Sequence, residues 1–69
     1  MCVKLGRRIR LLRTERGMTQ VQLADLAAPL SRVNLYRIEA GKAEPGCRTM
    51  TRIAHALGIK LRDLVDGLD

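Results

Sequence analysis

The segment 31–41, SRVNLYRIEAG, concentrates side chains that could contact a nucleic acid. On a helix with 100° per residue, Leu35, Ile38 and Glu39 fall on one side. The other faces carry two arginines, a valine and a tyrosine, namely Arg32, Val33, Tyr36 and Arg37.

Arginine can hydrogen-bond to O6 and N7 of guanine, and a small apolar side chain can contact a thymine methyl. We therefore interpret these four residues as candidates for reading base edges in a DNA major groove. The alternative is a surface helix whose arginines are merely solvated.

Local signals mark both ends of this helix. Ser31 is a good N-cap, because its hydroxyl can accept a hydrogen bond from a free amide of the first turn. Leu30 and Leu35 occupy the two positions of a hydrophobic staple. Gly41 can supply the left-handed residue that ends the helix. The sequence therefore predicts a short helix whose start is fixed by its own residues.

A second helix is predicted immediately before it, from Gln20 to about Ala27. Thr19 and Gln22 match the T-x-x-Q capping box at its start. Pro29 disfavours helical geometry at the residue before it and closes the helix. Two capped helices joined by about four residues form the helix-turn-helix pattern, in which the second helix enters the major groove. The alternative is an ordinary helical hairpin in a small bundle.

Three further helices complete the prediction, over 3–16, 47–57 and 61–65. Each carries apolar residues at helical spacing, and glycines at 17, 58 and 67 follow their ends. Gly6 lies inside the first of them, where glycine is a mild cost. Lys60 stands where a small polar cap would start the last one. We expect an all-α fold of five helices in a single domain, residues 1–69, with no linker or repeat.

Composition bounds the class of partner. The chain has thirteen basic and seven acidic residues, a net charge of +6 and a pI near 10.4, and ten of its basic residues are arginine. This balance favours a polyanionic partner, nucleic acid first and an anionic membrane second. The chain has no Trp or Phe, so its core must be aliphatic. It has no run of about 18 apolar residues and no secretion signal, so we expect a cytoplasmic protein without a membrane partner.

Cysteine and histidine do not suggest a catalytic or metal site. Cys47 is in step with Met50 and Ile53, so we expect a small core residue. Cys2, Cys47 and His55 match no zinc spacing, and His55 lies off the apolar stripe of its helix, as a solvated residue would. The sequence has no grouping of His, carboxylate and nucleophile and no phosphate-binding Gly loop. We expect neither an enzyme nor a cofactor, a metal or a small-molecule ligand.

Four segments of the chain form a pattern that is spread over most of its length: LGRRIRLLRTERGMTQVQLADLA, SRVNLYRIEAGKAEP, IAHALGI and LRDLV. In these segments the chain resembles the Cro and phage-repressor type of helix-turn-helix family. They span about residues 5–65, with anchors at Ile9, Arg13, Gly17, Thr19, Gln20, Leu23, Ala24, Ser31, Ile38, Glu39, Gly41, Pro45, Leu57 and Gly58. The resemblance implies a compact five-helix λ-repressor-like domain that binds DNA.

The resemblance also implies roles for single residues. In the family the residue that opens the second helix holds a DNA phosphate, which maps to Gln20, and the loop after the third helix grips the backbone, which points to Lys42. Arg48 is a weaker candidate for the backbone. Base reading maps to Arg32, Val33 and Arg37. Asn34 is the further residue that we expect to add affinity through the DNA backbone.

A structural salt bridge between Arg13 and Glu39 is expected for two reasons. The family pairs an arginine of the first helix with a glutamate of the third. Both residues also lie beside apolar stripes, four residues after Ile9 and Leu35 respectively, where a charge must be paired.

One departure from the family lies in the turn. Members usually have a glycine there and one residue fewer before Ser31, whereas here the turn reads Ala27-Ala28-Pro29-Leu30. Either the second helix gains a residue or the turn bulges.

The leading hypothesis is a sequence-specific transcriptional regulator that binds a pseudo-palindromic operator in double-stranded DNA as a homodimer. By analogy it would be a small repressor or autoregulator, such as a phage repressor or a restriction–modification controller. The resemblance places dimer contacts in the C-terminal third, where Leu61, Leu64 and Leu68 are the apolar residues available. These leucines could equally cover the core. The alternatives are an antitoxin-like protein, which also holds a toxin, and non-specific electrostatic binding.

Overall fold

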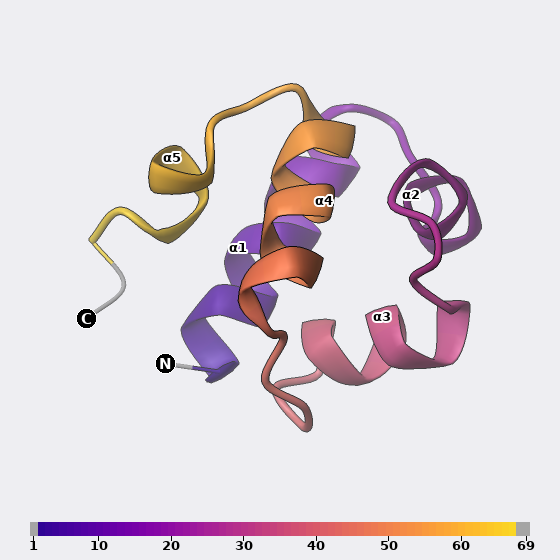
Figure 1. Cartoon of the computed structure of the whole chain (residues 1–69), viewed down its shortest axis with the longest axis horizontal. Coiled ribbons are helices and arrows are strands. Elements are labelled where there is room, and N and C mark those ends of the chain that lie inside the picture. The colour runs from indigo at the N-terminus through magenta and orange to yellow at the C-terminus, as the bar shows by residue number, and fades with distance from the viewer. Residues whose placement is uncertain (1, 68–69) are drawn as a thin grey trace.

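A computed structural model describes residues 2–67, apart from the side chain of Cys2. It contains five helices: α1 (Cys2–Glu15), α2 (Gln20–Leu26), α3 (Arg32–Glu39), α4 (Cys47–Leu57) and α5 (Leu61–Val65). In Figure 1, α1 and α4 lie at the centre, with α2 and α3 to one side of them and α5 to the other. The all-α prediction with five helices is therefore confirmed. Within the described residues, none of the helices is long and apolar enough to cross a membrane.

The core is aliphatic, as the composition predicts. Every helix contributes to one buried cluster, which consists of Leu5, Ile9, Leu23, Ala24, Ala27, Leu35, Ile38, Ile53, Ala54, Leu57 and Leu64. Ala24 of α2 and Ala27, which follows the helix as its C-cap, are small, and α2 packs against both α3 and α4. Small side chains at a helix contact let the two backbones approach closely, so the alanines favour this double packing.

The predicted caps are present at both helices of the helix-turn-helix. The Thr19 hydroxyl accepts from the Gln22 amide at 3.1 Å, and the Gln22 side chain accepts from the Thr19 amide at 2.8 Å. The Ser31 hydroxyl accepts from the Asn34 amide at 3.1 Å. Because α2 ends at Leu26, the additional residue lies in the turn rather than in the helix.

Cys47 corrects one prediction, because its side chain is exposed rather than in the core. Cys47 is the first residue of α4, and side chains of a helix tilt toward its N-terminus. Cys47 instead borders a surface hollow together with Arg48, Thr51 and Arg52, away from the apolar stripe. The stripe begins at Met50, which packs against the core. His55 is exposed, as predicted.

Gly6 has a larger role than the mild cost that the sequence predicts. A Cβ atom at Gly6 would collide with the carbonyl oxygen of Ile38 and would lie 2.7 Å from that of Glu39. Both atoms belong to the backbone at the end of α3, which cannot move aside as a flexible side chain could. The close crossing of α1 and α3 therefore requires glycine at this position.

Two arginines that the sequence left without a role connect distant helices. Arg8 donates to the carbonyl oxygens of Asp63 at 3.1 Å and Asp66 at 3.0 Å, next to the C-terminal end of α5. Arg16 Nε donates to the carbonyl oxygen of Leu57 at 2.7 Å, at the end of α4. Basic side chains satisfy the last carbonyls of a helix in this way. Both arginines therefore fasten the C-terminal helices to α1.

We expect Gly6→Ala to destabilise the domain. Overpacking against backbone costs up to about 3 kcal/mol, whereas alanine inside a helix recovers about 1 kcal/mol. The net loss of about 2 kcal/mol corresponds to a fall of about 10 °C in the thermal midpoint of so small a domain. Gly46→Ala is the control, because its added Cβ meets nothing within 4 Å. A midpoint for Gly6→Ala as high as that of the control would contradict the proposed close crossing.

We expect Lys60→Ser to stabilise α5. Lys60 is its N-cap, in an extended conformation, and makes no side-chain capping hydrogen bond. A serine hydroxyl there can accept from a free amide of the first turn, a gain of about 0.5–1 kcal/mol. Thermal unfolding should then shift upward by about 3–6 °C. Lys60→Ala removes the same charge without supplying a cap, so it should not reproduce the gain.

Candidate nucleic-acid interface

The outward face of α3 carries the four residues proposed to read bases. Leu35, Ile38 and Glu39 are buried on the inward side. Arg32, Val33, Tyr36 and Arg37 are all exposed on the remaining faces. The exposed fraction is 68% for Val33 and 55% for Tyr36, which is high for apolar and aromatic side chains. This short helix therefore divides into a packed side and a free side that presents two guanidinium groups.

A buried ion pair joins this helix to α1. Arg13 Nε donates to Glu39 Oε2 at 2.8 Å, and Arg13 Nη2 donates to Glu39 Oε1 at 3.1 Å. Two parallel hydrogen bonds of this kind fix both distance and orientation. The exposed fractions of the two side chains are only 11% and 4%, so water screens the pair poorly. The structure thus brings the two predicted partners together, at the crossing that Gly6 allows.

The same carboxylate reaches the start of α2. Gln20 Nε2 donates to Glu39 Oε1 at 3.1 Å, and Arg13 Nη1 donates to the Met18 carbonyl oxygen at 2.8 Å. Gln20, predicted to hold a phosphate, is therefore held by the ion pair at the edge of the outward face. Within residues 2–67, none of the buried side-chain nitrogen or oxygen atoms is left without a hydrogen-bond partner. This network sets the position of α3 relative to the start of α2.

Two open hollows lie on either side of Gln20 and Tyr36. The first is polar and is lined by Arg10, Arg13, Met18, Thr19, Gln20, Tyr36, Glu39 and Ala40. The second is mostly apolar and is lined by Gln20, Val21, Arg32, Val33 and Tyr36. The first offers the exposed cation Arg10 to an anion, and the second offers apolar surface beside the cation Arg32. Arg10 and Val21 were not among the predicted site residues.

The sequence contained only a weak signal for these two residues. Val21 is exposed although it is apolar, and helical spacing does place it off the side formed by Leu23 and Ala24. Nothing local shows that it lies beside Val33, which belongs to the next helix. Arg10 is one of several basic residues in α1, and only packing shows which of them borders the start of α2.

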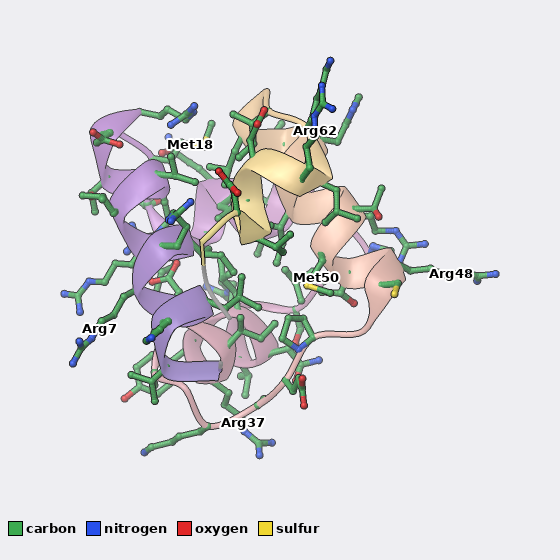
Figure 2. All side chains as sticks on the ribbon, turned by 90° about the vertical axis from the view of Figure 1, so that its left-hand side faces the viewer. Arg7, Met18, Arg37, Arg48, Met50 and Arg62 are labelled. Atoms are coloured by element: carbon green, nitrogen blue, oxygen red, sulfur yellow. The ribbon has the colours of Figure 1, made fainter. Side chains whose placement is uncertain are left out.

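The remaining candidates for the DNA backbone are more scattered. Lys42 and Arg48 are exposed, in the loop after α3 and in the first turn of α4. Figure 2 shows Arg37 and Arg48 projecting from different edges of the molecule. Asn34 borders a separate hollow formed with the loop residues 43–46. These residues lie around α3 rather than in one cluster.

The three leucines considered for a dimer interface have different surroundings. Leu64 is fully buried in the core of the single chain, which confirms for this residue the interpretation that it covers the core. Leu61 is partly buried and packs against the same core. Leu68 lies outside the described residues. Of the three, the structure describes only Leu61 with some surface left for a second copy.

Comparison with known proteins agrees with this architecture. A model of the helix-turn-helix family matches residues 9–64, so the chain belongs to this family. The crystal structure of the restriction-modification controller protein C.AhdI from Aeromonas hydrophila superposes with a TM-score of 0.88 at 36% identity. That match covers 91% of this chain and 94% of the controller protein.

Three relatives are longer proteins. The immunity repressor protein of Bacillus phage phi105 is 44% identical over 61 residues, which cover 88% of this chain and 42% of the repressor. The transcriptional regulator DdrOP3 of Deinococcus deserti is 36% identical over 67 residues, which cover 97% of this chain and 51% of the regulator. The prophage-derived regulator YonR of Bacillus subtilis is 34% identical over 62 residues, 90% of this chain and 56% of its own length. The chain thus spans about half the length of these relatives.

We expect Glu39→Ala to be strongly destabilising. It leaves the Arg13 guanidinium buried without a counter-charge, which costs about 3–5 kcal/mol. Chemical denaturation of this variant, beside Glu15→Ala as an exposed helical control, measures the loss. Replacing both partners, by Arg13→Met with Glu39→Leu, should cost clearly less than Glu39→Ala alone, because no buried charge remains. A chemical denaturation curve for Glu39→Ala that coincides with the curve of the control would refute the buried pairing.

Proposed function

We propose that this protein is a sequence-specific regulator of transcription that binds double-stranded DNA and reads the major groove with α3. The observation that carries the proposal is the free face of α3, where two arginines and two large exposed side chains stand on a rigidly held helix. The net charge of +6 supports a polyanionic partner. The relatives support the class, since their names describe an immunity repressor, transcriptional regulators and a restriction-modification controller.

The proposed role of each residue follows from its position in the structure. Arg32, Val33, Tyr36 and Arg37 read base edges, because they project from the exposed face of the helix that enters the groove. Gln20, Asn34, Lys42 and Arg48 hold phosphates around it. Arg13 and Glu39 do not touch DNA in this proposal. They fix the angle between α2 and α3, on which the register of every base contact depends.

We further propose that the protein represses as a homodimer. Two copies related by a two-fold axis would place their α3 helices in half-sites about 34 Å apart, one turn of the duplex. Leu61 supports a contact through α5, since it is an apolar side chain near the surface of the C-terminal third. Such a dimer would recognise a pseudo-palindromic operator.

Selection from a randomised duplex pool, sequenced at two salt concentrations, tests the proposal. A two-fold related consensus that persists at both concentrations is the expected result. Binding without a consensus, with affinity that falls uniformly as salt rises, would mean purely electrostatic attraction and would refute specific recognition. In that case a protein partner, such as a toxin, becomes the leading alternative.

We expect Arg37→Ala to relax one base position in each half-site of the selected consensus, with a loss of about 1–3 kcal/mol in binding. Arg62→Ala is the matched control. It removes the same charge from α5, and Figure 2 shows Arg37 and Arg62 at opposite ends of the molecule. An identical effect of both variants on affinity and consensus would assign Arg37 to general electrostatics rather than to base reading.

A further inference from the structure

The apolar hollow beside α3 is built from two helices. Val33 and Tyr36 of α3 and Val21 of α2 line it, together with Gln20 and Arg32 at its polar margin. Val21 is 43% exposed, and the other two apolar side chains are still more exposed. Single apolar residues on a surface need no explanation. Several that gather around one hollow, next to a proposed binding face, mark a site of contact.

The position of this hollow indicates which part of DNA it meets. Gln20 and Tyr36 separate it from the polar hollow that holds Arg10 and the Arg13–Glu39 pair. A major groove presents charged phosphates along its margins and base edges along its floor. The one apolar group on that floor is the 5-methyl group of thymine. A polar hollow and an apolar one side by side therefore match a phosphate and a thymine methyl.

We propose that Val21, Val33 and Tyr36 form a site for the 5-methyl group of a thymine, with Arg32 placed to contact a guanine in the adjacent base pair. This inference rests on the proposed function and adds the identity of the bases that this part of α3 selects. Arg32 supports it, because a guanidinium at the margin of an apolar site can reach O6 and N7 of a neighbouring guanine.

The chemistry of the hollow favours thymine over the other bases. Cytosine and adenine present amino groups in the major groove. Cytosine carries only a hydrogen at C5, where thymine carries its methyl group, so it would leave the valine surface exposed to water. Thymine instead covers the valines with a methyl group and so removes apolar surface from water. Guanine has no methyl group to place there and is matched by Arg32 instead.

Replacement of thymine by uracil is the most direct test, because it removes only the methyl group. The probe is the duplex obtained from the selection described above, with each thymine of one half-site replaced by uracil in turn. At one position or more, we expect affinity to fall about fourfold, the factor given by burial of one methyl group. A duplex with 5-methylcytosine paired to guanine at that position should bind more weakly than thymine. Equal binding would overturn the choice of thymine.

Variants then connect the methyl group to the hollow. In Val33→Ala and in Val21→Ala, the ratio of thymine to uracil affinity at the sensitive position should fall below about twofold. Leu26→Ala is the control, since Leu26 is 59% exposed but does not line this hollow. It should keep the full fourfold ratio. Because the ratio compares two duplexes with one protein, a change in folding does not alter it.

The outcomes separate this inference from the proposed function. Absence of any consensus would overturn both. A consensus in which no thymine is sensitive to uracil, or in which both valine variants keep full sensitivity, would overturn the methyl site and leave the regulator intact. Sedimentation of the protein without DNA gives a further outcome. Weaker self-association of Val33→Ala than of the unchanged protein would assign the hollow to a second copy of the chain, which also overturns the inference.

Discussion

The contact between α1 and the end of α3 governs the rest of the structure. Glu39 takes part twice, through its backbone, which lies against Gly6, and through its carboxylate, which is paired with Arg13. The carboxylate also accepts from Gln20, so one buried group positions three segments. A buried charge requires such complete pairing, because desolvation without partners would cost several kcal/mol. The exposed face of α3 owes its fixed direction to this inner contact.

The arginines of the chain serve two purposes, and net charge alone does not separate them. Arg8, Arg13 and Arg16 bond to carbonyl or carboxylate groups of other helices and hold the fold together. Arg32 and Arg37 are exposed on α3, the helix that we propose enters the DNA major groove. The sequence predicts the second group from helical spacing. The structural role of Arg8 and Arg16 escapes prediction, since their acceptors are backbone atoms about forty to sixty residues away.

Much of the architecture followed from short-range signals. The capping box at Thr19, the N-cap at Ser31 and the glycines after the helices act within a few residues, so the sequence contains the whole interaction. The bounds of α4 agree with the prediction, and α2 ends within a residue of it. The length of the turn before Ser31 is not determined by local residues. Either a longer helix or a longer turn suits the local residues, and the structure has the longer turn.

The sequence by itself therefore determined the helices, the aliphatic core and the free face of α3, because periodicity and capping depend only on neighbours in the chain. Tertiary structure alone decided what happens where segments meet. It made Gly6 indispensable and drew Leu64 into the core. It also set Val21 beside Val33, from a different helix. In each case the outcome depends on the distance in space between residues of different helices, and no local sequence pattern encodes that distance.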